Sequence, residues 1–207
     1  CNFIPSKKHF KQDNFISEFI LKGYSPKKPF IDKNKKIIAF GSCFASSVSE
    51  YLSTKNYLVF NKKYGLNSHI IRYGEGMAIP TSEFDEKKHG FKLSTADENT
   101  RNLDDICQII RKNLPSAKII FTLSPIPLMA TFRNQSCITA NSVSKSILRV
   151  SLDNVLTKYK EDNQIYYFPS YEITKDYLVD PFKDDNRHMK DEDLSFIMKV
   201  FEKNYCL

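Results

Sequence analysis

The segment from Ile37 to Leu52 places the strongest constraint on how this chain can fold. The run Lys36-Ile37-Ile38-Ala39-Phe40 is typical of a buried strand, and Gly41 ends it. The apolar residues that follow recur at helical spacing, which predicts a helix over 44–53. A strand must therefore become a helix within a few residues, and glycine tolerates the backbone angles that such a tight turn needs.

Comparable patterns recur along the rest of the chain. Further strands are predicted at 57–60, 119–123 and 165–168. Further helices are indicated by apolar faces within 103–114, 147–159 and 194–201. Strands that alternate with helices in this way indicate βαβ units and a mostly parallel sheet with helices on both faces. We therefore expect an α/β fold, a three-layer α/β/α sandwich.

The loops that follow the predicted strands are where a site is expected in such a fold. Ligands of open α/β sheets bind beyond the carboxyl ends of the strands. The loops that should meet on this rim are 41–45, 61–67, 124–133 and 169–190.

The lysines are concentrated near the start of the sequence. Residues 1–36 hold nine lysines and three acidic residues, so most of the formal net charge of +7 lies there. We expect a basic N-terminal arm over 1–34 that packs on or leads into an α/β domain over 35–207. A short amphipathic helix is predicted around Phe15–Leu21. A solvated, lysine-rich arm explains this composition better than a nucleic-acid site, because the folded body lacks a broad basic balance.

The five cysteines and the hydropathy narrow the class of protein. The cysteines include no CxxC pair and fit no zinc spacing, and their odd number argues against a full disulfide framework. Free thiols in a reducing compartment are the simpler interpretation, so we expect a cytoplasmic protein. No apolar run approaches the roughly 20 residues of a membrane-spanning helix. No metal or redox cofactor is indicated.

Cys43 is the first candidate for chemistry. It stands where the predicted helix begins, and free N–H groups and a partial positive charge at a helix start favour a thiolate and can bind an oxyanion. Ser42 is a poorer nucleophile and could instead cap the helix. The alternative is that Cys43 is a small buried hydrophobic residue, as most free cysteines are.

Two further segments could complete a site. Asp185 and His188 form a D-x-x-H pair, in which a carboxylate can fix the imidazole tautomer and leave the other ring nitrogen for a nucleophile. His69 is the alternative histidine. Gly65 and Asn67 follow the second predicted strand and could contribute to an oxyanion hole, although a simple turn would look the same.

These blocks together resemble a known family. Gly41-Ser42-Cys43-Phe44-Ala45 is similar to the signature of the GSCFA family, a group placed among SGNH-like hydrolases. Four later blocks, in the same order along the chain, are similar to other parts of that family: Tyr64–Asn67, Phe121–Pro127, Phe168–Ile173 and Asp185–His188. The resemblance implies an SGNH-hydrolase-like, flavodoxin-like sandwich.

The resemblance also implies roles for individual residues. Cys43 takes the place of the nucleophilic serine of the Gly-Asp-Ser block, with Ser42 matching the aspartate, while Asp185 and His188 match the Asp-x-x-His pair. Ser124, which begins the Ser-Pro loop, is expected with Gly65 and Asn67 at the oxyanion or substrate.

The expected function is acyl-ester chemistry by an esterase or O-acyltransferase, with a small-molecule or glycan ester as substrate. Acetyl-CoA or another acyl donor could serve as co-substrate. The sequence departs from the pattern of these relatives in two places. It lacks their Gly-x-Asn-Asp block, and Met189 stands where a proline often follows the final histidine. These departures leave open a non-catalytic glycan- or partner-binding module that keeps the fold. The oligomeric state is not indicated.

Overall fold

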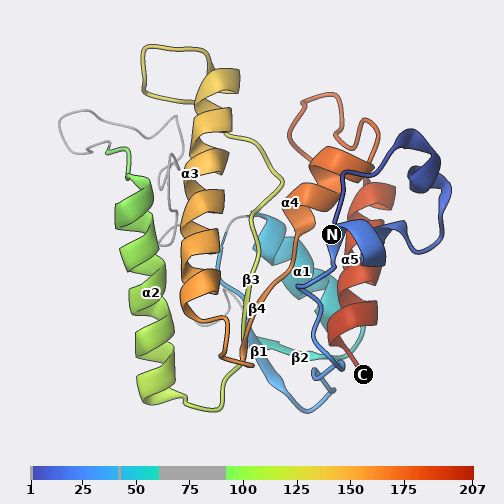
Figure 1. The fold of residues 1–207 in the computed structure, drawn as a ribbon, viewed down its shortest axis with the longest axis vertical. Helices are drawn as coiled ribbons and strands as arrows, with labels where there is room; N and C mark the ends of the chain where they lie inside the picture. The colour runs from blue at the N-terminus through green and yellow to red at the C-terminus, as the bar shows by residue number, and fades with distance from the viewer. Residues whose placement is uncertain (1, 42, 61–91) are drawn as a thin grey trace.

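The computed structural model describes residues 2–41, 43–60 and 92–207, which form a mixed α/β structure (Figure 1). Its strands are β1 Lys36–Ile38, β2 Leu58–Phe60, β3 Ile119–Phe121 and β4 Ile165–Tyr167. Its α-helices are α1 Cys43–Thr54, α2 Ala96–Asn113, α3 Cys137–Lys158, α4 Ser170–Glu172 and α5 Asp191–Tyr205. The alternation of strands and helices that the sequence predicts is confirmed.

The strands pair in parallel. β1 pairs with β2, where Ile37 lies opposite Val59, and β3 pairs with β4, where Ile120 lies opposite Tyr166. Among the described residues the pairing gives two two-stranded sheets, and a single sheet that contains all four strands stays a prediction. Each strand is three residues long, so each contributes few ladder hydrogen bonds to its neighbours.

The β3–β4 pair is covered on both faces, because its side chains alternate between two apolar clusters. Ile119 and Tyr167 pack with Leu103, Cys107, Leu123, Leu152 and Val155, chiefly from α2 and α3. Ile120 and Tyr166 pack against the other cluster, which includes Phe44, Phe168, Met189, Ile197 and Phe201. Strands buried on both faces are typical of parallel sheets.

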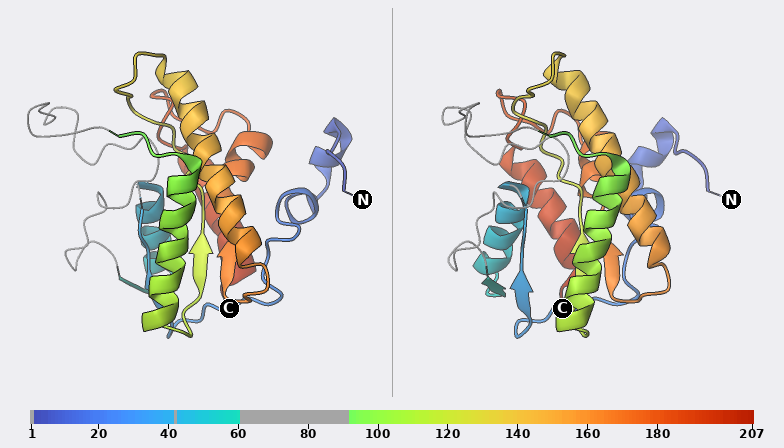
Figure 2. Two further views of the ribbon diagram at one scale, coloured as in Figure 1. Left: turned by 60° about the vertical axis from the view of Figure 1, so that its left-hand side comes forward. Right: turned by 90° about the vertical axis from the view of Figure 1, so that its left-hand side faces the viewer.

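The long helices lie on opposite sides of this strand pair. In all three ribbon views α2 and α3 run side by side, and α1 and α5 lie across the strands from them (Figures 1 and 2). The Ser151 hydroxyl joins α2 to α3 by donating to the Ala96 carbonyl at 2.9 Å. Ser136 caps α3 by accepting from the Ile138 N–H, so this helix begins well before the apolar face that the sequence marks at Ile147.

The N-terminal segment packs against the end of α5. The N–H of Ile31 donates to the Tyr205 carbonyl at 2.9 Å, and Ile31 bridges Cys206 in parallel. The short helix expected around Phe15–Leu21 is a π-helix, η2 Ile16–Ile20, preceded by the 3-10 helix η1 Lys7–Lys11. Its wide turn is closed by a Leu21 N–H bond to the Ile16 carbonyl, and Phe15 and Leu21 on either side of it are both buried.

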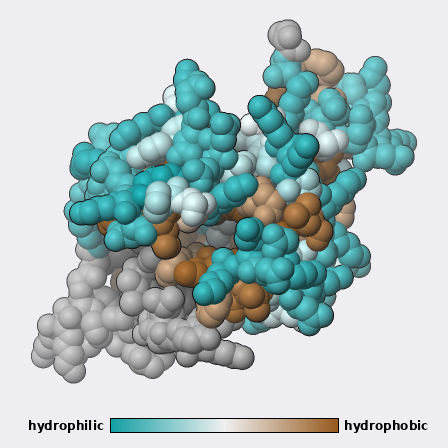
Figure 3. All heavy atoms as spheres, turned by 90° about the horizontal axis from the view of Figure 1, so that it is seen from below, coloured by the Kyte–Doolittle hydropathy of each residue, from teal (hydrophilic) through white to brown (hydrophobic). Residues whose placement is uncertain are grey.

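The face seen from below is mainly hydrophilic where its residues are coloured. Figure 3 shows apolar residues near the centre of that face, among hydrophilic ones. Over the residues that the structure describes, no helix combines the length and apolar character required to cross a membrane.

Candidate functional site

The turn between β1 and α1 depends on Gly41. Gly41 has φ +148°, a conformation that residues with a side chain rarely adopt, and a Cβ there would lie 3.1 Å from the Cβ of Ala45. That separation is tighter than an ordinary contact, so a side chain at position 41 would require Ala45 to shift by a few tenths of an ångström. Glycine at position 41 therefore suits both the backbone angle and the close approach of Ala45.

Cys43 and Phe44, at the start of α1, have different environments. Cys43 is the first residue of α1 and is exposed, whereas Phe44 is only 2% exposed and packs in the core. The thiol therefore stands at a helix start, where unsatisfied N–H groups favour negative charge. The expectation of an accessible thiol is met, and the alternative of a buried structural cysteine is not.

A buried lysine lies at the end of β3. Lys145 of α3 is 7% exposed, and its Nζ donates to the main-chain carbonyls of Ser124 and Ile126, both at 2.7 Å. Burial lowers the pKa of Lys145 to about 8, because the ammonium form loses its hydration. The Cys43 thiolate acts in the opposite direction and raises the pKa of Lys145.

Sequence reasoning missed Lys145, although the pattern held a signal. Lys145 precedes Leu148 by three residues and Leu152 by seven, so it belongs to the face of α3 that packs on the strands. A lysine is usually solvated, and fully buried lysines are rare. A lysine on the apolar face of a helix is therefore the exception that merits attention.

Asp185 and His188 are brought together in one turn. Asp185 Oδ2 contacts His188 Nδ1, and Oδ1 accepts from the N–H groups of Arg187 at 3.0 Å and His188 at 2.9 Å. The His188 contact, followed by these backbone bonds, holds the pKa of Asp185 well below its usual range. A carboxylate bonded to Nδ1 fixes the ring and leaves Nε2 directed elsewhere, which is the arrangement expected for an acid–base histidine.

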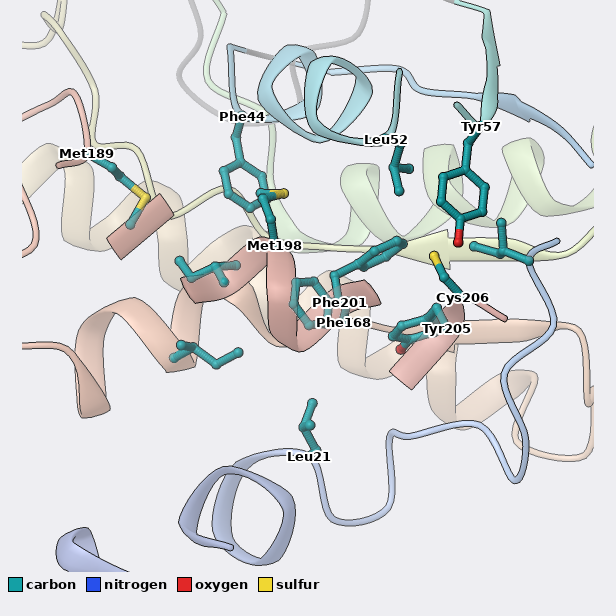
Figure 4. Packing of buried hydrophobic residues seen from close by; sticks show 13 residues of the cluster. Leu21, Phe44, Leu52, Tyr57, Phe168, Met189, Met198, Phe201, Tyr205 and Cys206 are labelled. Atoms are coloured by element: carbon teal, nitrogen blue, oxygen red, sulfur yellow. The ribbon is translucent and has the colours of Figure 1, made fainter. Parts of the chain in front are cut away.

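The turn that carries His188 is anchored beside the helix that carries Cys43. Met189 is 5% exposed and belongs to the same core cluster as Phe44 (Figure 4). Met189 also bridges Phe182 in antiparallel fashion, and the Lys183 N–H donates to the His188 carbonyl at 2.7 Å. The residue after His188 thus fastens the turn to the core.

The direct link between thiol and imidazole is not formed. Among the described residues, no hydrogen bond joins Cys43 Sγ to His188, whose side chain is 62% exposed. Proton transfer from Cys43 to His188 therefore stays a prediction. Four predicted residues lie outside the described ranges: Ser42, Gly65, Asn67 and His69.

Ser124 and the block after β4 serve the scaffold. The Ser124 hydroxyl accepts from the Ile126 N–H at 3.3 Å, which shapes its own loop. Ser170 is fully buried, and its hydroxyl lies 2.5 Å from that of Thr122 and donates to the Leu123 carbonyl at 2.9 Å. These bonds fasten the end of β3 to the start of α4. A substrate role for Ser124 stays a prediction.

Comparison with known proteins identifies a family. The model of the GSCFA family matches residues 72–201, which is more than half of the chain. The matched segment contains Ser124, Lys145 and the Asp185–His188 turn and begins after the Gly41–Ala45 motif. No curated protein and no solved structure matches the chain.

Proposed function

The chain belongs to the GSCFA family, and from this premise we propose that it performs acyl-ester chemistry with Cys43 as the nucleophile. The observation that carries the proposal is the exposed thiol that opens α1. A cysteine that only filled space would be buried. The Asp185–His188 turn supplies the acid–base group that such chemistry requires.

The reaction proceeds in two halves. The Cys43 thiolate attacks the acyl carbonyl, the C–S bond forms, and the C–O bond to the leaving alcohol breaks as His188 donates a proton to that oxygen. Water or a sugar hydroxyl then attacks the thioester, gives its proton to His188, and Cys43 departs as the thiolate. Asp185 keeps His188 oriented through both halves. The Cys43 N–H, with Gly65 and Asn67, is proposed to hold the oxyanion.

A thioester intermediate reacts readily with nucleophiles other than water, so transfer to a hydroxyl is as plausible a chemical outcome as hydrolysis. We therefore propose an esterase or O-acyltransferase that acts on a small-molecule or glycan ester. Acetyl-CoA is one acyl donor that could serve the transfer reaction.

The proposal extends to the fold. We propose that the two strand pairs belong to one SGNH-like sheet within a three-layer α/β/α sandwich. The proposal is supported by the burial of β3–β4 on both faces and by helices on either side of the strands (Figure 2). In such a sheet Cys43, which follows β1, and Lys145, bonded to the loop after β3, lie on the rim where α/β ligands bind.

A non-catalytic binding module is the second candidate function. The observation that favours it is the lack of a hydrogen bond between Cys43 Sγ and His188 among the described residues. A module of this kind would keep the fold and hold a glycan or a partner at the same rim without turnover.

Hydrolysis of p-nitrophenyl acetate by matched variants tests the enzyme proposal. Cys43→Ala and His188→Ala should each abolish turnover, whereas Cys137→Ala, at another free cysteine, should not. If Cys43→Ala retains activity and Ser42→Ala loses it, the nucleophile is assigned wrongly. If no tested ester is turned over but glycans bind, the binding module is the correct account.

A further inference from the structure

The N-terminal segment contains a hollow that lies outside the candidate site. Its volume is about 450 Å³, within the range of small-molecule sites, which is roughly 300–1,000 Å³. Three of the lining residues have rings and the others are polar, and the argument concerns Phe3, His9, Phe19, Asn14, Glu18 and Lys22. None of the lining residues belongs to α1, to α3 or to the turn before α5. A ligand in this hollow would therefore occupy a second, separate site.

The three rings that line the hollow contact one another. The ring centroid of Phe19 lies 5.9 Å from that of Phe3 and 5.3 Å from that of His9. Those of Phe3 and His9 are 5.6 Å apart. Phe3 is nevertheless 65% exposed. A large apolar ring left in water is unfavourable, so a ligand with an apolar face that covers it would gain hydrophobic free energy.

The ring of Phe19 is supported by aromatic contacts that lead into the folded body. Phe19 contacts Phe15 at a centroid distance of 5.2 Å, and Phe15 is only 2% exposed. Phe15 stacks on Tyr177 at 5.2 Å, and Tyr177 stacks on Phe196 of α5 at 5.7 Å. The N-terminal segment accordingly lies beside α5 (Figure 1). A wall that is already held in place loses little conformational freedom when a ligand binds.

The backbone that carries two of the lining residues has a rare conformation. Glu18 and Phe19 both belong to the π-helix η2 Ile16–Ile20. Such π-turns are uncommon in proteins and are found frequently at functional sites. This one places a carboxylate and an aromatic ring on the same hollow, which is a second indication that the hollow binds a ligand.

The polar side chains around the rings are available to a ligand. In the part of the chain that the structure describes, the side chains of Asn14, Glu18 and Lys22 form no hydrogen bond or ion pair with the protein. An amide both donates and accepts, a carboxylate accepts and an ammonium donates. Glu18 and Lys22 carry opposite charges, so the hollow as a whole favours neither a cation nor an anion. The lining therefore suits an uncharged ligand that has an apolar face and many hydroxyl groups.

We propose that this hollow binds a neutral sugar ring, with the apolar C–H face of the sugar stacked on Phe3 and Phe19. The sugar hydroxyl groups then bond with the side chains of Asn14, Glu18 and Lys22. A pyranose has this dual character, because its axial C–H groups form an apolar face while its hydroxyl groups project from the edge. A quaternary ammonium is the competing ligand for rings beside a carboxylate, but the charge of Lys22 opposes a second cation. The inference does not depend on ester chemistry.

Cellotriose and triacetylchitotriose, two uncharged oligosaccharides, are the probes for the proposal. Irradiation of the aromatic protons of the protein should transfer saturation to the C–H protons of a bound sugar, and calorimetry then measures the affinity. Phe3→Ala should weaken binding by roughly tenfold, because the exposed stacking surface is lost. Ile4→Ala is the matched control, since Ile4 is 91% exposed and does not line the hollow, and it should leave the affinity unchanged.

Glu18→Gln provides a second variant that keeps the shape of the hollow. It should weaken sugar binding severalfold, because a carboxylate accepts a stronger hydrogen bond than an amide does. Binding of neither oligosaccharide, or equal affinity in Phe3→Ala and the unmodified protein, would overturn the proposal. Tighter binding of choline than of both sugars would also overturn it, because the hollow would then be a cation site.

Ester turnover separates this inference from the proposed function. Phe3→Ala should hydrolyse p-nitrophenyl acetate at the unmodified rate, since the hollow contains no residue of the candidate site. Sugar binding that depends on Phe3, in a protein that turns over no ester, would leave this inference standing while the enzyme proposal fails. Cys43-dependent turnover without sugar binding would leave the enzyme proposal standing while this inference fails.

Discussion

Phe44 and Met189 bury their side chains in the same core cluster, although they lie far apart in the sequence (Figure 4). Phe44 follows Cys43 in α1, and Met189 follows His188 in the turn before α5. Each chemically interesting residue is thus adjacent to a buried anchor. One core cluster thus anchors both the segment that carries Cys43 and the segment that carries His188.

Met189→Ala should therefore destabilise the protein and loosen the His188 turn. Deletion of a buried methionine side chain costs about 2–5 kcal/mol. Met129→Ala is the matched control, because Met129 is 54% exposed and should cost little. Urea unfolding of both variants measures the difference. Equal free energies of unfolding would show that Met189 does not anchor the turn.

Gly41→Ala should disturb the turn that presents Cys43. The strained backbone costs about 1–3 kcal/mol, and the new Cβ would also press on Ala45. Gly23→Ala separates the two effects, because Gly23 also has a positive φ but an added Cβ would meet nothing within 4 Å. We expect Gly41→Ala to lower the unfolding free energy more than Gly23→Ala and to change the rate of Cys43 alkylation. A Gly41→Ala protein with unaltered alkylation would show that the turn does not control the thiol.

The free energy of unfolding should rise with pH because Lys145 is buried. Its pKa of about 8 lies below the ~10.4 of an unfolded lysine, so the unfolded chain binds more protons between these two values. The contribution of Lys145 to stability therefore rises across that window, by roughly 2–3 kcal/mol. Urea unfolding of the unmodified protein and Lys145→Met should diverge by this amount between about pH 8 and about pH 10. A constant difference over that range would contradict burial of a titrating amine.

Glu172→Gln should weaken the scaffold below the site. Glu172 accepts from the Tyr167 hydroxyl at 2.8 Å and from Arg149 Nε at 2.8 Å. Hydrogen bonds to charged groups contribute about 1.5–3 kcal/mol, so we expect a loss of that order. Glu161→Gln, at an exposed position, is the control. Thermal unfolding measures stability, and ester turnover per folded molecule should be unchanged. A loss of turnover without loss of stability would instead place Glu172 in the chemistry.

Much of the fold could be predicted because it follows from hydrophobic periodicity. The run at Ile119–Leu123 and the glycine at 41 locate β3 and the first turn to within a few residues. The start of α3 could not be located from apolar spacing, because its first turns are polar and a Ser136 cap begins the helix. The sequence pattern also does not specify how the short strands pair, since strand pairing depends on contacts between distant segments.

The candidate site was predictable where it depends on neighbours in sequence and not where it depends on tertiary burial. Asp185 and His188 are three residues apart, so a single turn brings them together. Lys145 acquires its interest only because α3 packs its side chain beneath the loop after β3. Lysine side chains are usually exposed, so the residue type predicts a solvated side chain. The contacts that bury Lys145 come from other parts of the chain.

The most direct test of the central claim is intact-mass spectrometry of the His188→Ala variant after incubation with p-nitrophenyl acetate. Because p-nitrophenolate is a weakly basic leaving group, it departs without a general acid, so Cys43 should still be acylated. Deacylation should stall, because it needs His188 as a base. The account predicts one acetyl group on the protein, located on Cys43 by peptide mapping and absent when Cys43→Ala is added. An acetyl group on Ser42, or ester turnover that persists in Cys43→Ala, would contradict it.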